Sequence, residues 1–315
     1  MKVSVCMAVY NGAKFIRQQL DSILCQSRRP DEVIMCDDGS KDDTVRIIKE
    51  FIRENSLQNT WKLFQNEQNK GYPGNFYHTM ALCGGEIIFL ADQDDIWHED
   101  KIAHMCQAFE KYPEANVISC RLKLIDAEGT DIHSIMMPVR GTNRKDLHKI
   151  SIEDVFYKCE WPGMVMAFRQ DWYQNRIGRD SVIPHDFLIC TRAAEEGGFY
   201  QMDEVLACHR RHDSNVGGEE HHLGKLLRRD RKVREIEDYM NILRAFEQEN
   251  ILCTEEGDVA LHKKIHSMQG RYDALLSGRP GRVLRNAVKH WHETRISTLL
   301  CDLYIVLIQG YVLRK

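Results

Sequence analysis

The sequence predicts an α/β fold with a mostly parallel central sheet, followed by a helical C-terminal extension. Three observations lead to this prediction. Short apolar runs of strand length alternate with segments of helical periodicity through the first half of the chain. Carboxylates or turn residues follow several of these runs directly, as at the ligand-binding ends of parallel strands. Beyond residue 218 the alternation stops and only helical periodicity continues.

The composition is that of a globular protein. The chain has 315 residues, of which 43% are hydrophobic and 29% charged, enough for one large domain or two ordinary ones. With a net charge of −4, we expect no nucleic-acid partner. The 11 cysteines contain no CxxC pair, so we expect reduced thiols and a cytoplasmic location. We interpret the short apolar N-terminus as a strand and not a signal peptide, and expect no membrane-spanning helix.

Strands and helices alternate from the N-terminus to residue 125. The apolar runs predict strands at residues 3–9, 33–36, 61–64, 86–91 and 116–125. Helical spacing of apolar residues, together with start and stop signals, predicts helices at residues 15–26, 43–52, 74–82 and 99–112. This order is the one expected for a parallel sheet covered by helices.

The second half of the first domain is less regular. Residues 126–150 have weak periodicity and predict a loop or lid. We expect strands at 164–168 and 203–208 and a helix at 185–196. We place the domain boundary after residue 218, giving domains 1–218 and 219–315, with a solvated hinge at 218–222.

The C-terminal region predicts helices at residues 223–246, 259–277, 283–295 and 296–313. The last of them is strongly apolar, but Thr298, Asp302 and Gln309 fall along one helical stripe. A membrane span would not tolerate Asp302. Two interpretations therefore stay open, a helix packed on protein and a helix lying on a membrane surface.

The most informative stretch is Asp92-Gln93-Asp94-Asp95, which follows the apolar run 86–91 directly. Carboxylates crowded at a strand end repel one another unless a cation neutralises them, and oxygen ligands suit Mg²⁺ or Mn²⁺. The alternative is a solvated acidic turn in which Asp95 caps the next helix. No GxGxxG or GxxxxGK[ST] string is present, which favours a metal-bridged diphosphate over a glycine-rich phosphate loop.

A family resemblance emerges when separated motifs are taken together. In chain order these are Val9-Tyr10-Asn11, Asp37-Asp38-Gly39-Ser40-Lys41-Asp42, Leu90-Ala91-Asp92-Gln93-Asp94-Asp95-Ile96-Trp97 and Arg210-Arg211-His212-Asp213-Ser214-Asn215-Val216. The set resembles the family 2 glycosyltransferases, nucleotide-sugar enzymes of the GT-A fold. It is most similar to a bacterial rhamnosyltransferase-like branch that builds cell-surface polysaccharides. The resemblance covers residues 1–218.

The resemblance implies a donor site. Tyr10 would lie along the nucleobase, and Ala8 would contact the base through its backbone. Asp38 would accept a base N–H, whereas Asp37 is interpreted as a turn residue. Asp92 would approach the ribose.

It also implies a site for the diphosphate. Asp94 would ligate the Mn²⁺ or Mg²⁺ ion that bridges the two phosphates, and His212 would complete the metal or diphosphate site. Asp95 is expected only to cap a helix. Arg210 would add positive charge beside the diphosphate, although a solvated surface position is an equal alternative.

The resemblance further implies a catalytic base and an acceptor pocket. Asp186 would take the proton of the acceptor hydroxyl, with a helix N-cap as its structural alternative. Trp161, Gly163 and His185 would line the acceptor site, where an aromatic face suits a sugar ring. Phe187-Leu188 stands where the branch usually has paired tryptophans, which leaves the acceptor open.

The predicted function is therefore inverting transfer of a sugar, which rhamnose would fit, from a UDP- or dTDP-linked donor. The acceptor would be a hydroxyl of a glycan or lipid-linked glycan. Two alternatives remain: a nucleotidyltransferase on the same fold, and a non-catalytic nucleotide-sugar-binding partner in a polysaccharide assembly complex. The C-terminal helices would either contact the inner face of the cell membrane or form a homodimer.

Overall fold

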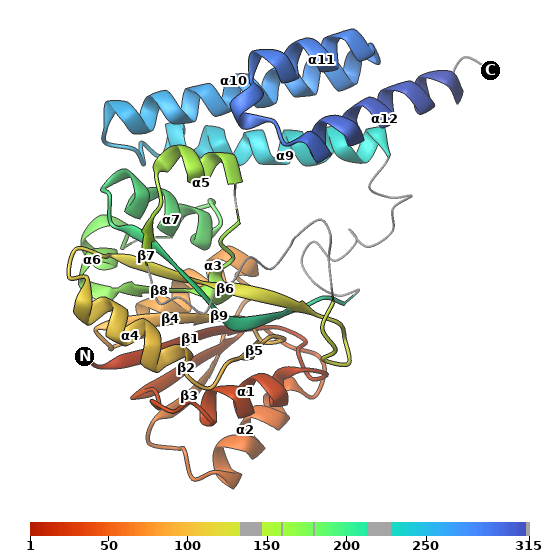
Figure 1. Ribbon diagram of the computed structural model, residues 1–315. Coiled ribbons are helices and arrows are strands. Elements are labelled where there is room, and N and C mark those ends of the chain that lie inside the picture. Colours follow the sequence, from red (N-terminus) through yellow and green to blue (C-terminus); the bar gives the residue numbers. More distant parts are fainter. Residues whose placement is uncertain (133–146, 159, 179, 213–227, 313–315) are drawn as a thin grey trace. The chain divides into compact units, whose positions relative to one another are not determined.

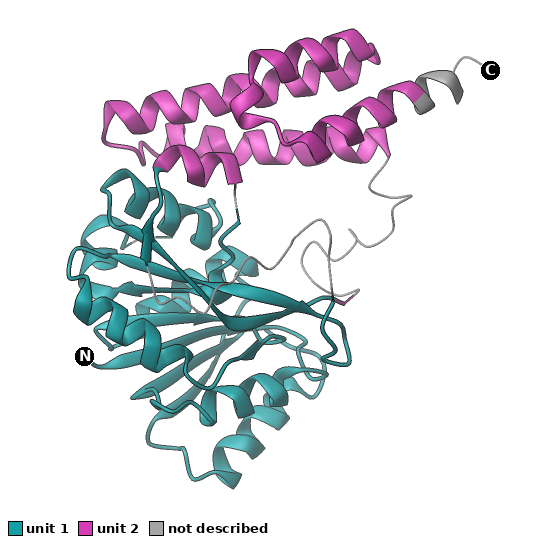
Figure 2. Cartoon of the chain, in the orientation of Figure 1, with its two compact units in different colours: residues 1–151, 159–211 teal, residues 152–158, 212–315 magenta. Residues whose placement is uncertain are grey.

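The computed structural model describes residues 1–132, 147–158, 160–178, 180–212 and 228–312, with side chains as far as residue 307. The chain divides into two compact units (Figure 2). Unit 1 comprises residues 1–151 and 159–211, and unit 2 comprises residues 152–158 and 212–315. The expected boundary and hinge at 218–222 lie outside the described residues.

Unit 1 contains one mixed sheet, in which nine strands are described (Figure 1). Its strand order is β3-β2-β1-β4-β8-β6-β9-β5, with β7 paired to β9. The strands are β1 (Val3–Val9), β2 (Glu32–Asp37), β3 (Trp61–Gln65), β4 (Ile87–Ala91), β5 (Ile96–Trp97), β6 (Val117–Ile125), β7 (Leu147–Lys149), β8 (Met166–Arg169) and β9 (Phe199–Arg210).

The first four long strands form the predicted parallel sheet. β1 pairs in parallel with both β2 and β4, and β2 pairs in parallel with β3. The second half departs from this pattern, because β8 lies antiparallel between β4 and β6. β9 then runs parallel to β6 and antiparallel to the short strands β5 and β7. The carboxyl ends of β1, β2 and β4 consequently meet at one edge.

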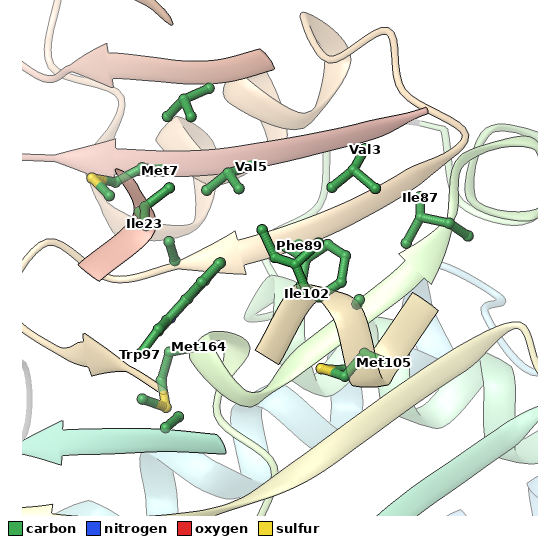
Figure 3. Close-up of a cluster of buried hydrophobic side chains, with 14 of the residues drawn as sticks. Val3, Val5, Met7, Ile23, Ile87, Phe89, Trp97, Ile102, Met105 and Met164 are labelled. Carbon is green, nitrogen blue, oxygen red and sulfur yellow. The ribbon is translucent and has the colours of Figure 1, made fainter. Parts of the chain in front are cut away.

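Helices supply the apolar faces that cover this sheet. They are α1 (Ile16–Leu24), α2 (Thr44–Glu54), α3 (Gly71–Ala81), α4 (Lys101–Lys111), α6 (Gln170–Arg176) and α7 (His185–Glu195). Alternate residues of β1 point into a core that also contains Phe89, Trp97 and Ile102 (Figure 3). All of these side chains are at most a few per cent exposed, which explains the unbroken apolar character of the strands.

Several short elements were not predicted. β5 follows the acidic turn and β7 lies within the expected lid, of which residues 133–146 are outside the described part. The start of the strand expected at 164–168 is different, because Gly163–Val165 form a 3₁₀ turn, η1, before β8. β9 is also longer than the predicted 203–208, because both of its ends pair with neighbouring strands.

Unit 2 is helical. Its elements are α5 (Ile152–Lys158), α9 (Arg229–Gln248), α10 (Glu255–Ser277), α11 (Pro280–Lys289), η3 (Trp291–Glu293) and α12 (Ile296–Val312). Thr254 caps α10 by accepting the backbone N–H of Gly257 at 3.0 Å, and Gly278 ends it with a φ of 61°. Among the described residues, no helix is both long enough and apolar enough to cross a membrane.

Candidate active site

The turn after β1 is held against the turn after β4 by a side-chain amide. The backbone N–H of Tyr10 donates to Gln93 Oε1, and Gln93 Nε2 donates to the carbonyl of Tyr10, both at 2.9 Å. A Cβ at Gly12 would lie 2.3 Å from Gln93 Oε1, so a larger residue there would displace this amide from its two hydrogen bonds. The Tyr10 ring remains 47% exposed, and half-buried Ala8 lies two residues before it. Gln93 was not predicted to act here.

Asp37 is the last residue of β2, Asp38 follows it, and the two have different partners. The Asp38 carboxylate is buried and accepts the backbone N–H of Lys70 at 2.8 Å and of Gly71 at 2.9 Å. It also accepts Nδ2 of Asn66 at 2.8 Å. A carboxylate has about four accepting positions, so these three bonds leave one unused. Asp37 accepts the N–H of Gly39 at 3.2 Å, which confirms its interpretation as a turn residue.

Carboxylates gather where β4 ends. Burial raises the pKa of Asp92 well above its usual value, and the charges of Asp95, Asp94 and Asp186 raise it further. Asp186 belongs to the first turn of α7, and its effect on Asp92 places the predicted base near the acidic turn. Tyr72, at the start of α3, lies near the same charges. Desolvation raises the pKa of its hydroxyl, and the charges of Asp186 and Asp92 raise it further. Tyr72 was missed because its only signal was a Gly-Tyr-Pro-Gly loop.

Asp95 does not cap a helix, contrary to the prediction. Its side chain is completely buried, and α4 begins six residues later with Asp100 as its N-cap. Oδ1 of Asp95 instead accepts the backbone N–H of Arg210 at 2.9 Å and faces Nδ1 of His209 at 3.1 Å. Asp95 therefore joins the acidic turn to the end of β9.

Arg210 is likewise a structural residue and not a surface cation. Its side chain is fully buried, and Nε donates to the carbonyl of Asp94 at 2.8 Å. The two terminal nitrogens donate to the carbonyl of Ala127 at 2.9 Å and to Gln18 Oε1 at 2.6 Å, and the guanidinium lies over the Phe15 ring. A guanidinium with these partners cannot also contact a diphosphate. Arg210 therefore lies neither beside a diphosphate nor at a solvated surface position, and both predictions are wrong.

Asp186 lies in the first turn of α7 and is half-buried. The N-cap position is occupied by Pro184, so the alternative of an N-cap aspartate does not hold. Oδ1 of Asp186 accepts the backbone N–H of Phe187 at 2.8 Å, which directs the carboxylate at the helix start. A negative charge at this end is favoured by the helix dipole.

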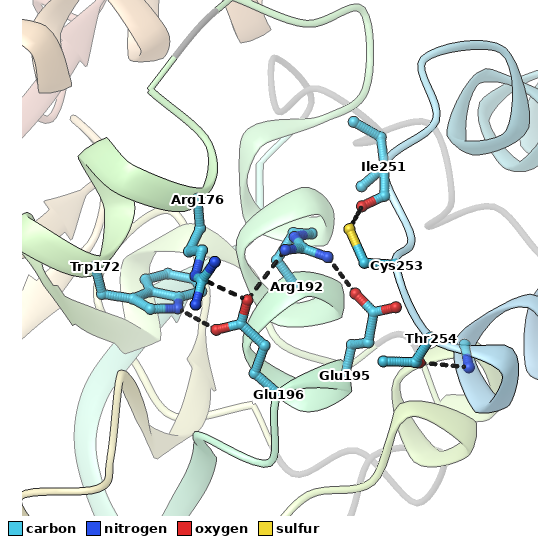
Figure 4. A network of polar contacts seen from close by, with 9 residues as sticks. Trp172, Arg176, Arg192, Glu195, Glu196, Ile251, Cys253 and Thr254 are labelled. Carbon is cyan, nitrogen blue, oxygen red and sulfur yellow. Dashed lines mark hydrogen bonds and ion pairs between the residues drawn. The ribbon is translucent and has the colours of Figure 1, made fainter.

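The other end of α7 is anchored by a polar network (Figure 4). Glu196 accepts Nε1 of Trp172 at 2.8 Å and Nη2 of Arg192 at 3.0 Å, and pairs with Arg176 at 3.2 Å. The Arg192 side chain is only 6% exposed and also pairs with Glu195. The network fixes α7 relative to α6 and thereby helps to set the position of Asp186.

The three predicted acceptor residues are inside the protein. His185 is completely buried and stacks on Phe76 with ring centroids 4.0 Å apart. A Cβ at Gly163 would lie 2.8 Å from His185 Nε2, so this glycine makes room for the histidine ring. Trp161 is 6% exposed and packs edge-on against Phe199. None of them offers an open face to a sugar, so the predicted acceptor contacts of these residues are wrong.

The oxygen ligands available at the acidic turn fit a divalent cation in part. Asp92 and Asp94 are half-buried oxygen donors in a region of accumulated negative charge. Within the described residues, no three His, Cys, Asp or Glu side chains group to hold a metal by themselves. Mg²⁺ at phosphate sites commonly takes one or two carboxylates and completes its shell with phosphate oxygens and water. His212 is the first residue of the second segment of unit 2, and residues 213–227 lie outside the described part. The role of His212 therefore stays a prediction.

Comparisons with known proteins point to one family. The model of the family described as Glycosyl transferase family 2 matches residues 4–173. An uncharacterized glycosyltransferase of Nostoc sp. is 27% identical over 219 residues, covering 68% of this chain and 66% of that protein. The putative glycosyltransferase EpsE of Bacillus subtilis is 32% identical over 128 residues, 41% of this chain and 45% of that protein. The matches thus span less than two thirds of these relatives.

Two solved structures share the fold. TarS 1–349 of S. aureus in complex with UDP has a TM-score of 0.60 at 18% identity, covering 86% of this chain and 72% of that chain. The mannosyltransferase PcManGT of Pyrobaculum calidifontis, in complex with GDP-Man and Mn²⁺, has a TM-score of 0.57 at 15% identity. It covers 97% of this chain and 86% of that chain.

Proposed function

Because the chain belongs to glycosyl transferase family 2, we propose that it transfers a sugar from a nucleotide-diphosphate donor to an acceptor hydroxyl. We propose a glycan or lipid-linked glycan of the cell surface as acceptor, and the cytoplasm as the place of reaction. The single observation that carries the proposal is the gathering of carboxylates where β4 ends: Asp92 and Asp94 follow the strand, and Asp186 at the start of α7 is near enough to act on Asp92. Burial raises the pKa of Asp92, and the charges of Asp94 and Asp186 add to this shift.

The donor would bind across the ends of β1, β2 and β4. In this proposal the exposed Tyr10 ring lies along the nucleobase, beside the backbone of Ala8. The accepting position left on Asp38 takes a base N–H, and Asp92 takes the ribose. Uracil and thymine present the same ring edge there, so a UDP- or dTDP-linked donor fits, with rhamnose as one candidate sugar. The related structures contain UDP, UDP-GlcNAc and GDP-Man.

The transfer itself needs a base. Asp186 would accept the proton of the acceptor hydroxyl while that oxygen forms its bond to the anomeric carbon. The bond from that carbon to the diphosphate oxygen breaks, and the electron pair leaves with the nucleoside diphosphate. Attack from the face opposite the leaving group inverts the anomeric configuration.

Asp94 would hold a Mn²⁺ or Mg²⁺ ion, with His212 as a second candidate ligand. When bound, the cation supplies positive charge against the charge that develops on the leaving diphosphate. The fully buried Lys101, whose Nζ donates to the carbonyl of Met164 and lies 3.8 Å from the Trp97 ring centroid, is directed elsewhere. The charge that balances the leaving diphosphate would therefore come mainly from the ion.

The test is a thermal-shift and turnover panel with UDP-, dTDP- and GDP-linked sugars, with and without Mn²⁺. A donor that binds only the folded protein raises the melting temperature. We expect a metal-dependent shift and donor hydrolysis in the wild type, and loss of both in Asp94→Asn. The matched control is Asp43→Asn, which removes an exposed carboxylate paired with Arg46 and should change neither. Metal-independent hydrolysis unaffected by Asp94→Asn would refute the metal role, and no turnover with any donor would refute the activity.

A further inference from the structure

Helix α12 buries its charged residue and exposes apolar ones, the reverse of an ordinary surface helix. Between residues 296 and 307 it carries one charged residue, Asp302. Asp302 is buried, and its two oxygens accept Nε and Nη2 of Arg271 at 2.7 and 2.9 Å. The charge thus faces α10, whereas a surface helix normally turns its charges to solvent.

The opposite face of α12 is apolar and exposed. Ile296 is 64% exposed, Leu300 61%, Tyr304 45% and Leu307 57%. Their spacing of four, four and three residues places them on one side of the helix. Exposed apolar side chains arranged as a stripe, and not scattered singly, usually indicate a binding surface.

The neighbouring helix adds a second apolar strip and positive charge. α11 packs against α12 and exposes Leu284 and Val288, which are one turn apart. The exposed cations Arg282, Arg285 and Lys289 lie along the adjacent side of α11. Among the described residues, none of these three cations has an ion-pair partner. An apolar strip bordered by unpaired cations is typical of a helix that lies in the headgroup region of an anionic bilayer.

We propose that the exposed faces of α11 and α12 bind the surface of a membrane that contains anionic lipid. The apolar side chains would enter the acyl boundary while Arg285 and Lys289 contact lipid phosphates. A second copy of the chain fits less well, because a two-fold contact through this face would oppose cations of the same sign. The proposal is independent of the transfer reaction, although a surface-bound enzyme would be near a lipid-linked acceptor.

The test is sedimentation of the full chain with vesicles of phosphatidylcholine alone or with about one third phosphatidylglycerol. We expect binding to the anionic vesicles only, weakening as salt is raised. Arg285→Gln with Lys289→Gln should lower the partition constant by about 25-fold, since each cation near the surface contributes roughly 1 kcal/mol. Leu300→Ser with Leu307→Ser should lower it by about tenfold or more.

Controls separate the surface from the fold and from the active site. Val182→Ser changes a residue that is 75% exposed in unit 1 and should leave vesicle binding unchanged. Melting temperature and donor hydrolysis in solution should be the same in every variant, so failure of the proposed activity would not affect this result. If the wild type stays in the supernatant with anionic vesicles, the proposal is wrong. It is also wrong if Leu300→Ser with Leu307→Ser converts an oligomer to a monomer without changing vesicle binding.

Discussion

The backbone N–H of Arg210 donates to the buried carboxylate of Asp95 at 2.9 Å, although the two residues are 115 positions apart. The side chain of the same arginine also donates, from Nε to the backbone carbonyl of Asp94 at 2.8 Å. Arg210, the last residue of β9, therefore holds the acidic turn at two neighbouring residues, through its backbone N–H and through its side chain. This contact joins the acidic turn to the last of the four motifs.

Removing Asp95 should loosen that contact. Asp95→Ala leaves the N–H of Arg210 buried without an acceptor, which costs roughly 1–3 kcal/mol of unfolding free energy. Asp95→Asn keeps one accepting oxygen and should cost less. The measurement is urea denaturation together with amide hydrogen exchange at Arg210. If Asp95→Ala left the exchange rate at Arg210 unchanged, the role assigned to this carboxylate would be wrong.

A methyl group at Gly163 should strain the packing under α7. The new Cβ would meet His185 Nε2 at 2.8 Å, and a stacked ring cannot move aside easily. Gly163→Ala is therefore expected to destabilise the protein by about 1–3 kcal/mol. Gly281→Ala is the matched control, because no atom lies within 4 Å of its Cβ position, and it should be neutral or slightly stabilising.

The same contact can be checked by a double-mutant cycle. His185→Asn removes the ring, so Gly163→Ala should cost much less in that background than in the wild type. Equal costs in both backgrounds would show that the strain arises elsewhere.

His185 should make the protein sensitive to acid. Burial lowers the pKa of His185 to about 4, although the Asp186 charge opposes this shift. Its unfolded pKa is about 6.5, so the unfolded chain binds more protons between these two values. Stability should fall as pH decreases from about 6.5 to 4, by up to ~3 kcal/mol from this group alone.

The contribution of His185 is isolated by difference. Urea midpoints of the wild type and of His185→Asn are compared at pH 7, 5.5 and 4.5. We expect the wild type to lose more stability over this range than the variant, which lacks the titrating ring. Parallel curves for the two proteins would contradict the assignment.

Asp186→Asn should separate donor binding from transfer. The amide still accepts the N–H of Phe187, so the start of α7 is preserved, but it cannot take a proton. We expect the transfer rate to fall by about 10²–10⁴ while the donor-induced thermal shift is kept. Loss of the thermal shift to the same extent as the rate would point to a structural role for this carboxylate.

Much of the fold could be predicted because its signals are local. The apolar runs of β1, β2, β3 and β4 and the helical spacing between them depend on residues within one turn or one strand. The same holds for the carboxylates that follow β2 and β4, which placed Asp38, Asp92 and Asp94 at one edge of the sheet. Short elements such as β5 and β7 carry too few residues for a periodic signal and exist only because β9 pairs with them.

The sequence by itself determined the α/β order, the acidic edge and the family resemblance, since each follows from composition and spacing along the chain. Only the tertiary structure decided which polar residues are buried. Arg210, His185 and Asp302 look like surface or site residues in the sequence, yet each meets a partner or a packing site far away in the chain. A buried charge is stable only where distant groups satisfy it, and spacing along the chain carries no information about groups that folding brings together.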